Sequence, residues 1–502
     1  MKCFRKILKI KMCIVSVIFK NKLGFETFSR NNDSKLNITK RRMIMDPRVN
    51  EYFDKIKEKY AAVRPNSLRL HQEACKYLPG GDTRTATFFY PFPNFMERGE
   101  GAYMYDRDGH KLLDFQNNYT SLIHGHGHAP TVEAVQKQIA LGSAYAAPFE
   151  KQIELAKLLT DRFPGMDLVR FTNSGTEANM NALRIARAYT GKAKIIKTEG
   201  GYHGTTDVFE ASVDPNIKKA GTLDQIKVIP ESRGVSANAL KDVLVVPFND
   251  IERTRKMVEE HHEEVACIII EPIMGSAGQI TPDIEYLQFL RKITEEYNIV
   301  LIFDEVVTGR LSIGGAQKHY GVTPDLTTLG KIIGGGTPVG AFGGKREIME
   351  MYDPREKKMY HSGTFNGNAV TMAAGLATMQ AFDEAAVAHV NALGSQFKEG
   401  MLKVYDKLGL NMKICGEGSI YNILFTNQDV KNYRDVAVAH EELNKVLYLA
   451  LITKGVFDAE RGMFCMSTAM TKSDIEFGVQ MVEEALQEML PIINIEAPEL
   501  FR

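Results

Sequence analysis

Short apolar segments that alternate with helical segments between residues 130 and 350 restrict most strongly how this chain can fold. Because these segments are short and mostly apolar, they are expected to be strands buried on both faces of a mostly parallel sheet. Ligands of such α/β sheets bind at the carboxyl ends of the strands. The segments are residues 168–171, 193–196, 244–246, 265–270 and 299–303.

The remaining regions predict a smaller α+β domain built from the N-terminal and C-terminal segments. Residues 1–45 differ from the rest, because they hold twelve Lys or Arg against two acidic residues. We expect this stretch to be a disordered basic extension; a transit peptide is the alternative, which its two acids disfavour. The expected division is 1–45 for the extension, 46–115 for the first part of the small domain, 116–365 for the large ligand-binding domain and 366–502 for the rest of the small domain.

Composition argues against several partner classes. Lys plus Arg and Asp plus Glu both number 62, so net charge gives no reason to expect nucleic acid or membrane binding. The apolar run 12–19 is shorter than the roughly 20 residues that span a bilayer. Six cysteines without a C-x-x-C pair predict neither a disulfide framework nor a zinc site, and we expect a cytoplasmic protein.

Asp304 and Lys331 are the strongest chemical signal. Asp304 ends the 299–303 segment, and Lys331 follows in the glycine-rich stretch 327–336. An acid at a strand tip and a lysine in such a loop are the minimum equipment for pyridoxal phosphate (PLP). The acid keeps the pyridine nitrogen protonated and the amine forms a Schiff base. An ordinary surface lysine is the competing interpretation, whereas a Walker A loop is excluded by Asp325 and Ile332.

Two further segments fit the same cofactor but also have structural explanations. Ser174, Gly175 and Thr176 would begin a helix at a strand end, where a phosphate binds well. The same residues are explained by a helix cap between Ser174 and Glu177. Tyr202 could stack on the cofactor ring or simply pack.

Three histidines at alternate positions could be the ligands of a metal site. His124, His126 and His128 are spaced by glycines, and neither cysteines nor carboxylates of a recognisable site lie nearby in the sequence. We therefore expect no metal site.

Six motifs between residues 173 and 368 make the chain resemble, over about residues 70 to 490, the class III PLP-dependent aminotransferases of fold type I. It is most similar to the branch of glutamate-1-semialdehyde 2,1-aminomutases and β-amino-acid aminotransferases. The motifs are Asn173-Ser-Gly-Thr-Glu-Ala178, Gly201-Tyr-His-Gly204, Glu271-Pro272, Phe303-Asp-Glu-Val306, Asp325 to Gly336 and His361-Ser-Gly-Thr-Phe-Asn-Gly-Asn368.

The resemblance implies a role for each matching residue and a homodimer with shared active sites. Lys331 corresponds to the lysine that binds the cofactor aldehyde, and Asp304 to the partner of the pyridine nitrogen. Val306 and Tyr202 correspond to the residues on the two faces of the ring. The implied phosphate site contains Ser174, Gly175 and Thr176 together with Thr364 from the neighbouring subunit.

The residues that would choose the substrate depart from the family pattern. Arg84 follows Pro79-Gly-Gly81 as the branch's carboxylate-binding arginine does, although a gapless alignment places that arginine nearer Thr87. Arg310 is the rival candidate. Residues 117–124 replace those that line the aminomutase pocket, so that substrate cannot be transferred.

These observations predict a PLP-dependent aminotransferase that moves an amino group between an amino acid or amine and a keto acid or aldehyde by a ping-pong mechanism. The alternative is intramolecular amino transfer by an aminomutase of the glutamate-1-semialdehyde type. A weaker alternative is a PLP-fold binding protein without catalysis, although such a protein has no need of the Asp304 and Lys331 pair.

Overall fold

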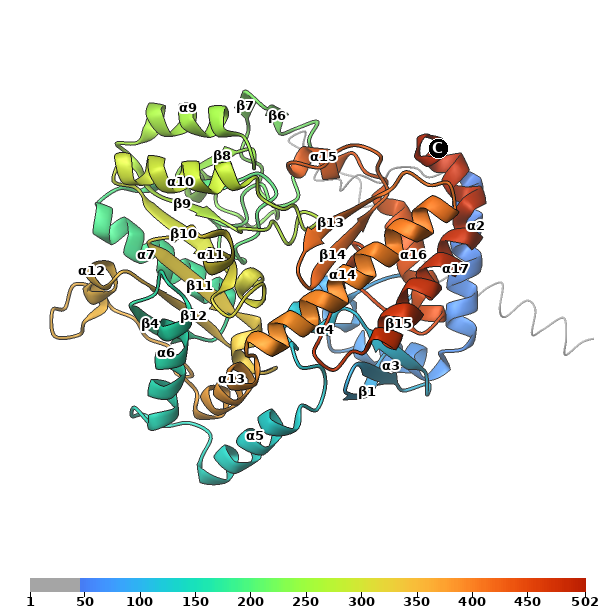
Figure 1. Cartoon of the computed structure of the whole chain (residues 1–502), viewed down its shortest axis with the longest axis horizontal. Coiled ribbons are helices and arrows are strands. Elements are labelled where there is room, and N and C mark those ends of the chain that lie inside the picture. Colours follow the sequence, from blue (N-terminus) through green and yellow to red (C-terminus); the bar gives the residue numbers. More distant parts are fainter. Residues whose placement is uncertain (1–45) are drawn as a thin grey trace, which may run out of the picture. The chain divides into compact units, whose positions relative to one another are not determined.

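The computed structural model describes residues 46–502, so the basic extension expected over residues 1–45 lies outside the described residues. A seven-stranded sheet with the strand order β4-β12-β11-β10-β9-β5-β8 forms the centre of the first part of the described chain (Figure 1). Its strands are β4 (Leu168–Thr172), β5 (Lys194–Thr198), β8 (Val243–Val246), β9 (Val265–Ile270), β10 (Val300–Asp304), β11 (Leu326–Gly330) and β12 (Gly340–Gly344).

The sheet is mostly parallel, as the apolar segments predict. Strands β8, β5, β9, β10 and β11 run parallel to their neighbours in that group, whereas β12 is antiparallel to both β11 and β4. Strand β12 approaches the end of β4 so closely that a Cβ atom on Gly340 would lie 2.0 Å from the carbonyl oxygen of Ser174. Only glycine fits at that position.

The central strand β9 is buried on both faces, which explains why it is apolar throughout. In β9, Ile268 and Ile270 pack in one core with helices α9 and α10, while Cys267 and Ile269 pack in another core with helix α7. The helices that accompany the sheet are α5 (Ala129–Leu141), α6 (Glu150–Arg162), α7 (Gly175–Thr190), α8 (Ala237–Leu240), α9 (Ile251–His261), α10 (Ile284–Glu296), α11 (Gly315–Tyr320), α12 (Arg346–Met349) and α13 (Ala369–Ala381).

The N-terminal and C-terminal segments share a second, smaller set of sheets. Strands β2 and β3 pair as an antiparallel hairpin, and β15 adds to β3 in parallel. The strands are β1 (Met96–Glu100), β2 (Tyr103–Asp106), β3 (Lys111–Asp114) and β15 (Val456–Phe457) in one sheet, and β13 (Lys413–Glu417), β14 (Ile420–Leu424) and β16 (Met463–Cys465) in another. A two-stranded ribbon consists of β6 (Gly221–Thr222) and β7 (Gln225–Ile226).

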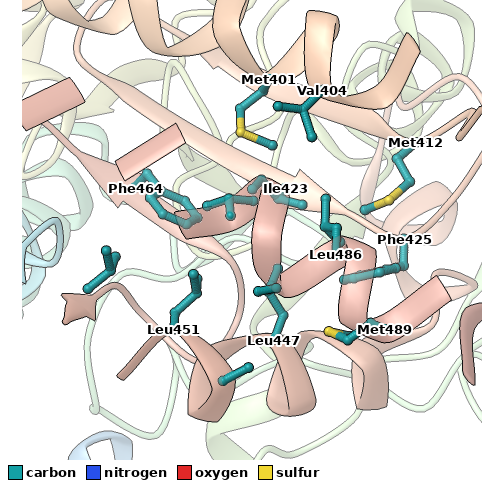
Figure 2. Close-up of a cluster of buried hydrophobic side chains, with 14 of the residues drawn as sticks. Met401, Val404, Met412, Ile423, Phe425, Leu447, Leu451, Phe464, Leu486 and Met489 are labelled. Carbon is teal, nitrogen blue, oxygen red and sulfur yellow. The ribbon is translucent and has the colours of Figure 1, made fainter. Parts of the chain in front are cut away.

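Long helices complete this region and enclose its core. Figure 2 shows that core, in which Met401 and Val404 of α14, Leu447 of α16 and Leu486 of α17 meet. The helices are α2 (Pro47–Ala62), α3 (Pro65–Ala74), α14 (Glu384–Lys407), α15 (Tyr433–Ala437), α16 (Glu441–Thr453) and α17 (Lys472–Glu496). Within residues 46–502, no helix is both long enough and apolar enough to cross a membrane.

Candidate active site

Asp304 lies at the tip of the central strand β10, where two buried side chains hold it. The Oδ2 atom of Asp304 lies 2.8 Å from Nδ1 of His203 and accepts a hydrogen bond of 2.7 Å from Nδ2 of Asn179. Its Oδ1 atom accepts a hydrogen bond of 3.1 Å from the backbone of Val306. The carboxylate is therefore fixed in one orientation at the carboxyl end of the sheet.

The neighbouring acid, Glu305, points to a different environment. Its carboxylate accepts hydrogen bonds from the backbone of Ala316 and Gln317 and from the side chains of Thr308 and Gln317. Burial raises the pKa of Glu305. Ala316 and Gln317 belong to helix α11, so Glu305 holds that helix in place, which supports Asp304 rather than Glu305 as the candidate cofactor residue.

Lys331 follows strand β11 in an unusual backbone conformation. Its φ angle is +50°, a left-handed value that is uncommon for a residue with a side chain and that often marks functional sites. Burial, and then the positive charge of Arg461, lower the pKa of Lys331 to about 8. The amine is thus much closer to its neutral, nucleophilic form at physiological pH than an exposed lysine would be.

The candidate phosphate residues begin helix α7. Ser174 is the N-cap, and its hydroxyl accepts a hydrogen bond of 3.2 Å from the backbone of Glu177, so the structural role expected for this residue is present. The backbone N–H groups and positive dipole end of the 16-residue helix still favour an anion at this point. Asn173 donates a hydrogen bond of 2.9 Å to Asn366, which brings the loop that contains Thr364 beside this helix terminus.

Tyr202 lies in a loop whose backbone is held by buried charged groups. Its N–H donates a hydrogen bond of 2.9 Å to Glu271, whose pKa is raised to about 7 by burial and by the nearby charge of Asp304. Lys197 is fully buried and donates hydrogen bonds to the carbonyl oxygens of Gly201 and Ala211. The tyrosine ring itself is partly exposed.

Three glycines let the candidate residues approach one another, and their surroundings fit PLP. A Cβ atom on Gly204 would lie 2.4 Å from the hydroxyl of Thr176, and Cβ atoms on Gly175 and Gly330 would lie within 3.1 to 3.3 Å of Val306. Gly175 and Gly330 therefore pack closely against Val306. An amine of lowered pKa, a fixed buried carboxylate and a helix N-terminus match the aldehyde, the ring nitrogen and the phosphate of PLP.

Arg84 lies at the rim of a cavity of about 190 Å³ that Phe88, Tyr448 and Phe457 also line. Its guanidinium donates a hydrogen bond of 3.0 Å to Oδ1 of Asn118. The side chain is exposed, so part of the guanidinium stays available for a ligand.

Arg310 is enclosed in the fold instead. Its guanidinium donates to the hydroxyl of Ser419 at 3.0 Å, to the carbonyl oxygen of Thr120 at 3.3 Å and to that of Met466, and it contacts Cys465. Only 1% of the side chain is exposed. These contacts give no support to the hypothesis that Arg310 binds substrate.

Arg461, which the sequence analysis did not consider, is the arginine whose charge reaches Lys331. Its Nε atom is buried and has no hydrogen-bond partner among residues 46–502. Its positive charge acts on the amine of Lys331 and on the carboxyl group of Glu271. No local signal reveals this role, because Arg461 lies in a loop between β15 and β16, far along the chain from the cofactor motifs.

The histidines make internal contacts. His124 lies 2.7 Å from the hydroxyl of Thr468, and His126 lies 2.8 Å from the carboxylate of Asp114. Over the described part of the chain, no group of three or more His, Cys, Asp or Glu side chains is arranged to hold a metal ion.

Comparisons with known proteins agree with this geometry. The family described as "Aminotransferase class-III" matches residues 88–486. A glutamate-1-semialdehyde 2,1-aminomutase of Methanocaldococcus jannaschii is 39% identical over 84% of this chain and 96% of its own length. Two solved structures are also similar. An omega-transaminase from Sphaerobacter thermophilus has a TM-score of 0.82 at 41% identity and covers 84% of this chain and 97% of its own. A transaminase with PLP bound has a TM-score of 0.80 at 32% identity and covers 85% and 98%.

Proposed function

The chain belongs to the class III aminotransferases, PLP-dependent enzymes of fold type I, and on this premise we propose which of its residues carry the amino transfer. Lys331 is the lysine that binds the cofactor aldehyde, and Asp304 is the partner of the ring nitrogen. One observation supports this proposal. A lysine that has a φ of +50° and a pKa lowered to about 8 occurs together with a carboxylate that His203 and Asn179 hold in place.

Each of these residues has a defined task. PLP, when bound, supplies an aldehyde and a ring that accepts the electrons of a substrate C–H bond. Asp304, held by two buried partners, keeps the proton on the ring nitrogen. The amine of Lys331, when it is not bonded to the cofactor, would act first as a base that accepts a proton from the substrate carbon and then as an acid that returns the proton to a second carbon. The lowered pKa of Lys331 allows this transfer near neutral pH.

The remaining candidate residues position the cofactor. Ser174, Gly175 and Thr176 offer the helix N-terminus to the phosphate. Val306 packs on one face of the ring, and Tyr202 covers the other. Glu271 supports the Tyr202 loop through the backbone hydrogen bond of 2.9 Å.

The substrate that fits this site is an amine that also carries a carboxylate. Arg84 and Arg461 both lie within 5.9 Å of the Tyr119 ring, and Arg461 has an unpaired buried N–H. A carboxylate is the partner that such guanidinium groups bind best, by paired charge-assisted hydrogen bonds. Arg310 lies outside this proposal because its hydrogen bonds are already made.

Trapping of the cofactor tests the proposed lysine. Purified protein with PLP should be yellow, should bleach when borohydride is added, and should then carry a phosphopyridoxyl mass on the peptide that contains Lys331. A label on another lysine would refute the assignment. Protein that stays colourless with PLP would favour the alternative of a binding protein without catalysis.

Transaminase and aminomutase use the same residues, and a product assay separates them. A donor screen should include α-amino acids, β-amino acids and simple amines. An aminotransferase releases a free carbonyl product from the donor in an amount equal to the enzyme when the acceptor is left out. If an amino acid isomerises while no carbonyl product accumulates, the aminomutase is the correct assignment.

Two further expectations belong to this proposal. Thr364 is exposed, so a second subunit can contact it, and in the proposed homodimer it reaches the partner's cofactor. The cysteines within residues 46–502 are all free, which suits a reducing compartment such as the cytoplasm.

A further inference from the structure

Residues Asn117–Thr120 form one turn of left-handed backbone, a rare conformation for residues with side chains. Their φ angles are +49°, +47°, +53° and +74°, and none of the four is glycine. Left-handed residues normally occur singly, because Cβ collides with the following carbonyl oxygen. Such strain persists only where surrounding contacts enforce it, and it gathers at functional sites.

The two middle residues of the turn, Asn118 and Tyr119, hold the segment that carries Arg84. Oδ1 of Asn118 accepts the hydrogen bond of 3.0 Å from the Arg84 guanidinium. The hydroxyl of Tyr119 donates to the carbonyl oxygen of Ala86, two residues after that arginine. Both the side chain of Arg84 and its backbone segment are therefore attached to the turn.

The same turn is attached to the segment that follows Arg461. Nδ2 of Asn117 donates a hydrogen bond of 2.8 Å to the carbonyl oxygen of Cys465. Arg310 joins the carbonyl oxygens of Thr120 and Met466 through one buried guanidinium. Arg310 thus has a structural role in this linkage.

Tyr119 is the common neighbour of the two arginines. The guanidinium carbons of Arg84 and Arg461 each lie 5.9 Å from the centre of its ring, within the range of a cation–π contact. An aromatic ring can attract two cations by cation–π interactions, and it does not neutralise their charges as a carboxylate would. Both guanidinium groups remain able to bind an anion.

The turn also keeps polar atoms buried without partners. Asn117 Oδ1 and Thr120 Oγ1 have no hydrogen-bond partner among the described residues. A buried unpaired polar group is destabilising, and native proteins contain few of them. Strain and unpaired atoms in one four-residue segment indicate that the segment is kept for its placement rather than for its stability.

We infer that the left-handed turn Asn117–Thr120 determines carboxylate specificity, because Asn118 and Tyr119 fix the positions of Arg84 and Arg461 beside the candidate active site. This inference rests on the proposed function. Asn118 and Tyr119 are positioning residues, since they act through the two arginines. Substrates that bring a carboxylate to this point depend on the turn, and substrates without one do not.

The experiment compares two donors that differ only in a carboxylate, in the wild type and in Asn118→Gly. Glycine accepts the φ of +47° without strain, so this variant removes the side chain and keeps the backbone. A lost hydrogen bond to a charged group changes binding by about tenfold. We expect KM for the carboxylate-bearing donor to rise by about that factor, while kcat and the KM of the donor without a carboxylate change by less than about twofold. Tyr119→Phe, which keeps the ring, should act in the same direction through the lost contact with Ala86.

Asn298→Gly is the matched control, because Asn298 also has a positive φ, of +51°, but is exposed after helix α10. It should leave every KM unchanged. An equal rise of KM for both donors in Asn118→Gly, or no rise for either, would overturn the inference. A wild type that converts none of the donors would instead refute the proposed function. Unchanged PLP absorbance and melting temperature in Asn118→Gly show that a change in KM is not a folding defect.

Discussion

Lys331 and Arg461 carry charges of the same sign, and the charge of Arg461 affects the pKa of Lys331. The positive charge of Arg461 adds to burial in lowering the pKa of Lys331 to about 8. A lysine of lowered pKa is the neutral nucleophile above that value, whereas an ordinary lysine needs a pH above about 10.4. Arg461 therefore favours the neutral amine of Lys331 even when no substrate is bound.

Replacing this arginine should move the pH dependence of cofactor binding. In cofactor-free protein, the rate at which PLP attaches to Lys331 should rise with pH and level off above about pH 8. Arg461→Gln removes the repulsion that disfavours the ammonium form, so the Lys331 pKa rises and the plateau moves to higher pH. Absorbance kinetics across the neutral and alkaline range measure this. Arg187→Gln, at the far end of helix α7, is the control and should leave the profile in place. A profile that does not move in Arg461→Gln would contradict the electrostatic link.

The two residues also differ in how visible they are in the sequence. Lys331 lies among glycines, and Asp304 ends a buried strand, so local pattern is enough to nominate both. Arg461 comes to the site through the pairing of β15 with β3, which joins residues more than 300 positions apart. The sequence does not distinguish the roles of Arg84 and Arg310. Only the structure shows that Arg84 is exposed and that Arg310 is buried with a structural role.

At the level of elements, helix α15 supports the loop that contains Tyr202. Arg434 on this helix pairs with Glu199 at 2.7 Å, and Glu199 is 1% exposed. The ring of Tyr433 packs against Gly200, where a Cβ atom would lie 2.6 Å from it. Only two residues separate Glu199 from Tyr202, so α15 supports the base of that loop.

Breaking this ion pair should weaken both the fold and cofactor retention. Arg434→Ala leaves the Glu199 carboxylate buried without its partner, which typically costs about 3 kcal/mol or more. We expect a lower melting temperature and faster loss of PLP on dialysis. Lys431→Ala is the matched control, because the exposed Lys431 side chain lies 4.0 Å from Asp283 and its loss should change stability by less than about 1 kcal/mol. Equal effects of the two substitutions would disprove the role of α15.

The main strands could be predicted from the sequence, because burial of a strand leaves a mostly apolar segment. The apolar segments 168–171, 265–270 and 299–303 correspond to β4, β9 and β10 within one residue at each end. The left-handed turn Asn117–Thr120 could not be predicted. Asn tolerates positive φ, but Tyr119 and Thr120 do not favour it, and distant contacts impose it. Helix α15 was also unforeseen, since five residues carry too little periodicity.

At the scale of the whole molecule, apolar side chains are exposed around the loop that carries Thr364. Tyr360 is 85% exposed and Phe365 is 59% exposed. The same loop and the start of helix α6, including Ile153, line a groove of about 630 Å³. Large apolar side chains grouped on a surface mark an interaction site, and a second copy of this chain is the partner that the proposed shared active site requires.

Subunit mixing tests whether Thr364 acts on the partner's cofactor. Lys331→Ala removes the amine, and Thr364→Glu places a carboxylate that repels the phosphate, so each variant alone should be nearly inactive. In a mixed dimer, one site combines Lys331 of one chain with Thr364 of the partner subunit and is intact. Because random pairing makes half of the dimers mixed and one of their two sites is intact, co-expression should restore about a quarter of wild-type activity. A chain with both substitutions, co-expressed with Lys331→Ala, is the control and should restore none. If Thr364 acts within its own subunit, or if the protein is a monomer, the first mixture will also stay inactive.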